Sequence, residues 1–313
     1  QVLDKISVKI LAARNSQRQL SVVLVGLTFL SSMLITNDVA LLTFVPLTLM
    51  IARRAGFDPG YMVILQALAA NIGSSLTPLG NPQNLFLFSH YNIPLTQFLK
   101  LMLPFAAAGA LWLALLNLRT GNEKLEYSLE PVDTGRPGKI ALYALLFLAV
   151  VLSVLRVLDY RLVTVAVIAV MLVLDRHLLA RVDYCLLGTF LCFFIAVDNL
   201  SHFQALSMLL QDSLATASAS FFGSVLLSQF ISNVPCAILI ANYSQQWPAV
   251  LLGVNVGGMG TLVASMASVI AYRCYVREYK GNGYLGQFLG YNLLSLAVIL
   301  PIACCWLFAT PLP

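Results

Sequence analysis

The sequence predicts an all-α polytopic membrane protein with an inverted-topology repeat, in which each repeat contains one re-entrant helical hairpin and one discontinuous helix. Hydrophobic residues make up 59% of the 313 residues and charged residues 10%, and the mean hydropathy is +0.86. Such a composition is typical of chains that cross a bilayer several times. Two long apolar stretches carry polar residues at their midpoints, and motifs recur in the same order in both halves of the chain.

The two apolar stretches, residues 21–52 and 217–247, are each predicted to fold as a re-entrant hairpin. The polar residues at their midpoints are Thr36, Asn37 and Asp38 in the first stretch and Ser232 and Asn233 in the second. Each half of a stretch forms roughly 24 Å of helix, which is short for a hydrocarbon core of about 30 Å. The tips therefore lie near mid-membrane, where polar groups are costly unless they face protein, water or a ligand. Such tips are typical of a transport site.

The segment that follows each hairpin is predicted to be a helix with a break. Residues 61–88 contain glycines, prolines and amide side chains within 69–84. A continuous helix does not pass through such a run, because proline removes an N–H and glycine lowers helix propensity. The counterpart, residues 249–272, carries glycines without proline, which predicts a softer break. Broken helices expose N–H and C=O ends at membrane depth, where they can coordinate an anion at one end and a cation at the other.

The charges predict the topology. The remaining crossings are expected at residues 98–118, 140–155, 162–174, 184–200 and 288–308. All of the 18 lysines and arginines except Lys100, Arg156 and Arg161 then lie on one side of the membrane, which the positive-inside rule assigns to the cytoplasm. The first hairpin consequently enters from the cytoplasm. No lysine or arginine lies between Arg181 and Arg273, so the second hairpin enters from the outside.

Matching motifs predict a first repeat over residues 1–118, a cytoplasmic linker over 119–139 and a second repeat over 140–313. The corresponding residues are Asn37 with Asn233, Asn71 with Asn255, Gly73 with Gly257 and Thr77 with Thr261. Repeats that enter from opposite faces are the architecture of many secondary transporters. The second repeat has apolar segments over 140–200 before its hairpin, whereas the first has only the amphipathic stretch 2–19. We therefore expect that further N-terminal crossings belong to the full protein.

The polarity at the tips and breaks identifies candidate site residues. Those for substrate are Thr36, Asn37, Thr77, Pro78, Ser232, Asn233 and Thr261, and those for a coupling ion are Asn37, Asp38, Gly73, Asn233 and Gly257. Small and amide residues in membrane helices also mediate close packing and interhelical hydrogen bonds, so a structural role is the alternative for each of them. Asp38 is the one acidic residue at a hairpin midpoint, where an ionised carboxylate needs a cation or hydrogen-bond donors.

Three motifs carry a resemblance to a known family. They are Thr36-Asn37-Asp38, residues 77–84 and Ser232-Asn233-Val234-Pro235. Together they resemble the ion transporter superfamily, which groups divalent-anion/sodium symporters, arsenite permeases and sodium/proton antiporters. Asp38 and the pair Val234-Pro235 make the tips more similar to the arsenite permease branch than to the dicarboxylate symporters.

The resemblance implies an elevator-type secondary active transporter, in which hairpins and broken helices slide against a scaffold of the flanking crossings. It implies a small anion or oxyanion as the substrate, coupled to a Na⁺ or H⁺ gradient. Arsenite or antimonite efflux and Na⁺/H⁺ antiport are the alternatives. The expected location is a bacterial or archaeal inner membrane. No cofactor is expected apart from Na⁺ or H⁺ as the coupling ion; the partners are the substrate and lipid, with a homodimer as one oligomeric state.

Other classes of protein fit the sequence less well. The basic residues form no stripe that would bind nucleic acid, and the six cysteines form no C-x-x-C pair that would hold a metal or a disulfide. An intramembrane enzyme would need a positioned nucleophile or a metal set at membrane depth, whereas the three histidines lie near segment ends. A channel is the second alternative, but broken helices opposite polar tips favour an occluded site over a continuous pore.

Overall fold

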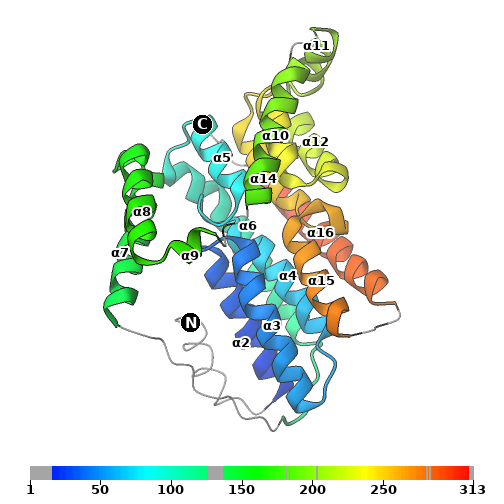
Figure 1. The fold of residues 1–313 in the computed structure, drawn as a ribbon. Coiled ribbons are helices and arrows are strands. Elements are labelled where there is room, and N and C mark those ends of the chain that lie inside the picture. Colours follow the sequence, from blue (N-terminus) through cyan, green and yellow to red (C-terminus); the bar gives the residue numbers. More distant parts are fainter. Residues whose placement is uncertain are drawn as a thin grey trace.

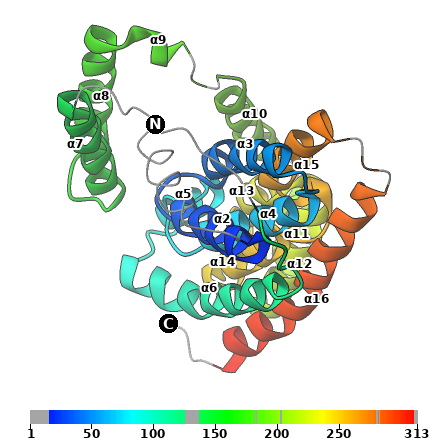
Figure 2. The ribbon, with the colours of Figure 1, turned by 90° about the horizontal axis from the view of Figure 1, so that it is seen from below.

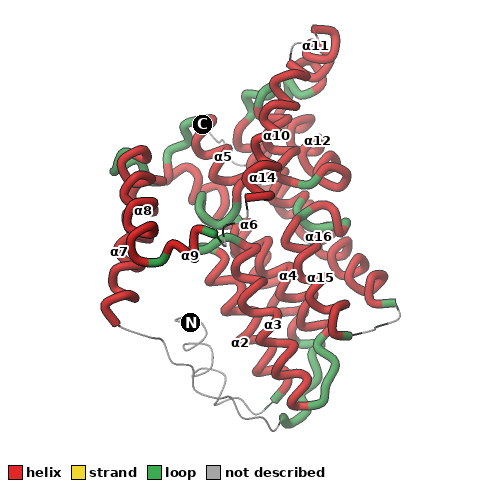
Figure 3. The backbone as a smooth tube through the Cα atoms, viewed as in Figure 1, coloured by secondary structure: helices red, strands yellow, loops and turns green. Residues whose placement is uncertain are grey.

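The computed structural model describes residues 16–125, 137–180, 182, 184–201, 204–279, 281 and 283–309. This part of the chain is almost wholly helical and contains no strand (Figure 1, Figure 3). Its α-helices are α2 (Gln17–Ser32), α3 (Asn37–Ala55), α4 (Gly60–Ser74), α5 (Pro82–His90), α6 (Leu95–Asn117), α7 (Pro137–Val154), α8 (Tyr160–Leu174), α9 (Arg176–Leu179), α10 (Tyr184–Ser201), α11 (Gln204–Ser213), α12 (Ala217–Ile231), α13 (Asn233–Ala241), α14 (Trp247–Gly257), α15 (Met266–Glu278) and α16 (Tyr284–Ala309). The helical class predicted from the sequence is confirmed.

Short hydroxyl residues begin the helices of the hairpins. Ser16, Thr36 and Thr216 each accept a hydrogen bond at their side-chain oxygen from the backbone N–H three residues further on, at 3.3, 3.5 and 3.2 Å. Such caps satisfy an N–H that has no partner within the helix. Gly56 ends α3 with φ of 75°, a left-handed conformation that glycine adopts without strain.

Two buried helices, α4 and α14, form the centre of the molecule. Every residue of α4 except Tyr61 is buried, and α14 is buried from Ala249 onward. Each packs closely on the first arm of a hairpin through glycine. A Cβ placed on Gly73 of α4 would lie 2.3 Å from the carbonyl oxygen of Phe29 in α2, and one placed on Gly257 of α14 would lie 2.8 Å from Cβ of Ser228 in α12. Larger side chains would hold these helices apart.

The helix contacts of the two halves correspond. Helix α2 packs on α4 as α12 packs on α14, and α4 packs on α6 as α14 packs on α16. The second arm of each hairpin crosses to the other half, because α3 packs on α15 and α13 packs on α5. Helices α2 and α3 lie in the lower half of Figure 1, and α12 lies in the upper half.

Longer helices flank this centre. Figure 2 shows α6 and α16 curving around one side of the bundle, and they contact each other. Among the described helices, these two are long and apolar enough to cross a membrane, while further apolar helices such as α8 and α12 have 10–17 residues. Helices α7 and α8 stand apart as a pair in both views. Arg156, between them, donates a hydrogen bond to the carbonyl oxygen of Phe88 at 2.9 Å and lies over its ring.

Several boundaries differ from the sequence prediction. The second break is complete rather than soft: α14 ends at Gly257, a short 3₁₀ turn covers Leu262–Ala264, and α15 begins at Met266. Gly260, with φ of 118°, replaces proline as the cause. Helix α15 also continues beyond the predicted end at residue 272, and α13 has 9 residues, fewer than the expected half-hairpin. Most of the predicted amphipathic stretch 2–19 and part of the linker lie outside the described residues.

Candidate functional site

A pocket of about 140 Å³ lies where the two hairpin tips meet. The tip residues in its wall are Asn37 and Asp38 from the first hairpin and Ser232 and Asn233 from the second. The wall also contains Pro82, Gln83, Thr189, Phe193, Ile231, Val234, Pro235, Ser265 and Met266. Tips that lie far apart in the sequence therefore share one small cavity.

Four helices begin at the wall of this pocket. They are α3 at Asn37, α5 at Pro82, α13 at Asn233 and α15 at Met266. The N-terminus of a helix carries a partial positive charge because its first N–H groups have no partner within the helix. Four such ends around one cavity suit it to an anion. Asp38, in the first turn of α3, is the acidic residue in the wall.

Asn37 is held in place by a second asparagine behind it. Its side-chain oxygen accepts a hydrogen bond from the backbone N–H of Asp38 at 2.9 Å, and its Nδ2 lies 3.5 Å from Oδ1 of Asn71. The same oxygen of Asn71 accepts a hydrogen bond from the hydroxyl of Ser265 at 2.8 Å, and Asn71 Nδ2 donates to the carbonyl oxygen of Gly258 at 3.3 Å. Asn71 therefore connects the first tip to the break in the second half.

A buried amide also closes the first break. Nδ2 of Asn84, in α5, lies 3.1–3.3 Å from the carbonyl oxygens of Ser74, Ser75 and Thr77, at and directly after the end of α4. Its Oδ1 accepts a hydrogen bond from Nδ2 of Asn255 in α14 at 2.7 Å. The carbonyl groups freed by the break therefore have a partner without water.

Gln229 of α12 plays the corresponding part at the second break. Its Nε2 donates to the carbonyl oxygens of Gly257 at 2.7 Å and Met259 at 3.2 Å. Its Oε1 accepts a hydrogen bond from the N–H of Thr261 at 2.9 Å, and the hydroxyl of Thr261 donates to the carbonyl oxygen of Gln229 at 2.8 Å. These four hydrogen bonds bind the end of α14 and the loop after it to the second hairpin.

Ser232 carries backbone strain at the tip of the second hairpin. Its φ of 73° and ψ of 153° fall in a region that glycine favours, and a residue with a side chain stays there at a cost of about 1–3 kcal/mol. Its hydroxyl donates to the carbonyl oxygen of Ala264 at 3.5 Å. Strain of this kind occurs often at ligand sites, and here it adjoins the pocket.

The remaining predicted site residues lie outside the pocket wall. They are Thr36, Gly73, Thr77, Pro78, Gly257 and Thr261. Thr36 caps α3, and the hydroxyl of Thr77 donates to the carbonyl oxygen of Met33. Gly73 and Gly257 lie at the close helix contacts described above. Thr36, Thr77, Gly73 and Gly257 therefore contact the hairpins and breaks, and a role for these residues in binding stays a prediction.

Sequence reasoning missed part of the wall and most of its support. Gln83 and Ser265, which are in the wall, come directly after the two breaks in the chain. The run 69–84 also showed a concentration of amide side chains in the sequence. The correspondence of Asn71 with Asn255 was visible too, although neither was assigned to the site. Thr189 and Phe193 come from α10, whose apolar sequence carries no signal that it reaches this pocket.

A helical bundle with a pocket between two hairpin tips and broken helices is typical of membrane transporters, and comparison with known proteins agrees. The sequence profile of citrate transporters matches residues 1–247, and the chain belongs to this family. An uncharacterized transporter of Methanocaldococcus jannaschii is 35% identical over 291 residues, which cover 92% of this chain and 78% of that protein. The inner membrane protein YbiR of Escherichia coli K12 is 35% identical over 260 residues, covering 82% and 70%.

A shorter stretch of the chain is similar to a plant transporter. A silicon efflux transporter of Oryza sativa is 38% identical over 82 residues, covering 26% of this chain and 17% of that protein. Membership of the citrate transporter family makes the chain an integral membrane transporter and not an enzyme. It agrees with the resemblance to the ion transporter superfamily without singling out the arsenite permease branch.

Proposed function

We propose that this protein is a secondary active transporter that moves a small anion or oxyanion across the membrane, with the pocket between the hairpin tips as its substrate site. The observation that carries this proposal is the convergence of four helix N-termini and the amides of Asn37 and Asn233 on one cavity. Fixed partial positive charges at membrane depth bind an anion without a permanent cation. The wall residues Asn37, Ser232 and Asn233 are the proposed substrate ligands, supported by Thr36, Thr77, Pro78 and Thr261.

The proposed mechanism is an elevator built on an inverted repeat. The corresponding helix contacts of the two halves support a duplicated unit. The crossing of α3 to α15 and of α13 to α5 supports a single mobile body made of both hairpins and both broken helices. In this proposal α6 and α16 belong to the scaffold against which that body slides.

The proposed coupling ion is Na⁺ or H⁺, with Asp38 as its main ligand. Asp38 is the acidic residue in the pocket wall. A carboxylate beside a bound anion requires a cation or a proton to offset the repulsion between the two negative charges. Asn37 and Asn233 offer neutral oxygens in the same wall. The backbone near Gly73 and Gly257 is the second candidate for this ion, although the carbonyl of Gly257 already accepts a hydrogen bond from Gln229.

The size of the pocket bears on the substrate. A cavity of about 140 Å³ lies below the roughly 300–1,000 Å³ of sites for larger molecules, which favours a compact oxyanion. Citrate, after which the family is described, is the second candidate and would require the tips to separate. Efflux of arsenite or antimonite, Na⁺/H⁺ antiport and efflux of a silicon oxyacid are further outcomes of a substrate panel. We place the protein, as a proposal, in a bacterial or archaeal inner membrane, with a homodimer as one oligomeric state.

Flux in proteoliposomes tests the substrate site. The panel contains phosphate, sulfate, arsenite, silicate and citrate, each with and without a Na⁺ or H⁺ gradient. Asn37→Ala and Asn233→Ala should each abolish the flux found for the wild type, because each removes a polar group from the pocket wall. Asn242→Ala is the matched control, since Asn242 bonds to its own helix at the far end of α13. Wild-type flux in both tip variants would mean that these amides serve packing alone.

A further inference from the structure

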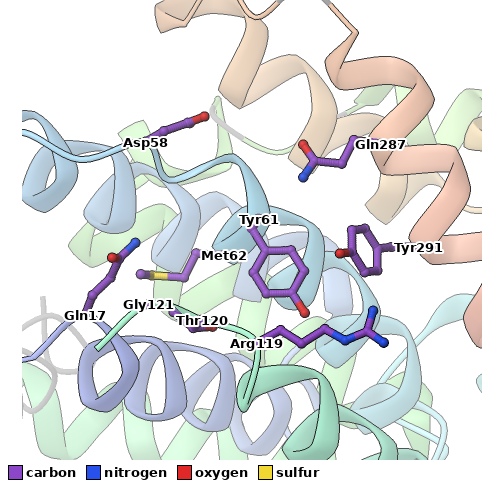
Figure 4. A pocket seen from close by; sticks show the side chains of 9 residues that line it. All are labelled: Gln17, Asp58, Tyr61, Met62, Arg119, Thr120, Gly121, Gln287 and Tyr291. Atoms are coloured by element: carbon purple, nitrogen blue, oxygen red, sulfur yellow. The ribbon is translucent and has the colours of Figure 1, made fainter. Parts of the chain in front are cut away.

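A second pocket of about 290 Å³ is shown in Figure 4. It lies at the opposite end of α4 from the pocket between the hairpin tips (the tip pocket) and shares no wall residue with it. Tyr61 lies in α4, Arg119 and Thr120 follow α6, and Gln287 and Tyr291 belong to α16. The pocket therefore spans the contacts of α4 with α6 and with α16. Its volume suits a ligand of the size of a lipid headgroup rather than a larger molecule.

One side of this pocket offers donors to an anion. The guanidinium of Arg119 makes no hydrogen bond or ion pair within the described part of the chain, and it can hold a phosphate by two parallel hydrogen bonds. Thr120, beside it, is only 4% exposed, and its hydroxyl oxygen finds no hydrogen-bond partner among the described residues. A buried hydroxyl without a partner is costly, and an acceptor in the pocket removes that cost.

The other side of the pocket offers an acceptor. In Figure 4, Asp58 and Arg119 lie on opposite sides of Tyr61. One carboxylate oxygen of Asp58 accepts hydrogen bonds from Tyr275 and from the N–H of Gly60, both at 2.9 Å. The ring of Tyr61, which lies between these two charged residues, packs against that of Tyr291 with 4.9 Å between centroids. The pocket thus places a cation at one end and an anion at the other.

We propose that this pocket binds a phosphate ester with a short hydroxyl or ammonium arm, the phosphate on Arg119 and Thr120 and the arm toward Asp58. This chemistry is shared by the headgroup of phosphatidylethanolamine and by free phosphoethanolamine. Because the wall comes from both the proposed mobile body and the proposed scaffold, occupancy ties α4 to α6 and α16 and slows transport. This regulatory consequence rests on the proposed function, whereas the binding does not.

Binding is measured on the full-length, delipidated protein in detergent by calorimetry. One arm titrates free phosphoethanolamine, and the other compares nanodiscs of phosphatidylcholine with nanodiscs that also contain phosphatidylethanolamine, by thermal shift. Arg119→Gln should weaken whichever interaction the wild type shows by about tenfold or more, as expected for loss of a charged hydrogen-bond donor. Arg277→Gln, an exposed arginine outside the pocket, should leave it unchanged.

Two further variants keep the result interpretable. Thr120→Val preserves the shape and removes the unpartnered hydroxyl, so it should weaken binding while the unliganded protein stays at least as stable. Asn233→Ala should retain the Arg119-dependent binding even when it abolishes transport, which separates this site from the tip pocket. Absence of binding from both sources in the wild type, or equal binding in Arg119→Gln, would overturn the proposal.

Discussion

Single amide side chains hold the broken backbone together. At membrane depth no water is available to satisfy the N–H and C=O groups that a helix break frees. The side-chain NH₂ group of Asn84 donates to three such carbonyl oxygens, and that of Gln229 donates to two. An asparagine at such a position is therefore required by the shape of the backbone as much as by any ligand.

Replacement of Asn84 by alanine should lower stability strongly. The variant removes the donor shared by three carbonyl groups and leaves Asn255 Nδ2 without one acceptor, and each buried polar group without a partner costs about 1–3 kcal/mol. We expect a loss of about 3 kcal/mol, seen as a lower melting temperature in detergent. Asn242→Ala should change it little, since Asn242 makes one bond to its own helix. An unchanged melting temperature in Asn84→Ala would contradict the role assigned to this amide.

Whole elements are positioned by close contact between α4 and α2 and between α14 and α12. The contacts depend on glycines that let one backbone approach another. They keep the end of each central helix beside a hairpin, so that the break and the tip face the same cavity. The geometry of the site thus depends on small residues that never touch it.

Gly73→Ala, at the contact of α4 with α2, and Gly26→Ala, at an open position of α2, form a matched pair. The Cβ at Gly73 would lie 2.3 Å from the carbonyl oxygen of Phe29, whereas nothing lies within 4 Å of a Cβ at Gly26. Gly73→Ala should destabilise the protein by about 1–3 kcal/mol because the helices must move apart. Gly26→Ala should stabilise α2 by up to about 1 kcal/mol because alanine favours the helix. Thermal melts of the two variants in one detergent check both signs; equal melting temperatures would refute the packing role of Gly73.

At the scale of the whole molecule, the pocket between the hairpin tips is built from two halves of the chain, and neither half completes it alone. Each half supplies one hairpin tip and two of the four helix N-termini in the wall. In the proposed mechanism, a movement of one hairpin tip therefore changes the distances between the substrate and the binding residues of the other tip. Asp38 breaks the equivalence, because the corresponding residue of the second tip is Val234.

Asp38→Asn tests whether this asymmetry couples transport to an ion. The variant keeps the shape and removes the charge, so accumulation driven by a Na⁺ or H⁺ gradient should be lost while substrate exchange persists, because exchange needs no net ion movement. If Asp38 only favours the N-terminus of α3, a contribution of roughly 0.3–1 kcal/mol, the variant should be nearly silent. Gradient-driven uptake in proteoliposomes distinguishes the two; accumulation at the wild-type level would remove Asp38 from the coupling mechanism.

The sequence predicted the helical class, the transporter class and the position of both interruptions, because each follows from local polarity against an apolar background. It predicted that Asn37 and Asn233 matter, and the structure places both at one pocket. The second break was predicted to be soft because its segment contains no proline, but Gly260, with a positive φ, makes the break complete. Elevator motion, membrane orientation and the coupling ion stay predictions.

Contacts between helices far apart in the sequence could not be predicted from sequence patterns, because they depend on how the helices pack. The approach of Thr189 and Phe193 to the pocket depends on how α10 packs, and apolar periodicity does not specify a partner. The support given by Gln229 depends on two carbonyl groups that exist as acceptors only after the chain has broken at Gly257. Such contacts are properties of the assembled fold.

The hydrogen bonds of Asn71 and Asn81 have a consequence for biosynthesis. Their partners Ser265, Ser268 and Asn255 lie 174–197 residues later in the chain. At about 5–20 residues per second, a ribosome supplies them roughly 9–40 seconds after the asparagines have been made. During that interval the first half is in the membrane with its central amides unsatisfied by these partners. Its final folding therefore awaits the synthesis of α14 and α15, and a chain that ends before α15 should be an early substrate for membrane quality control.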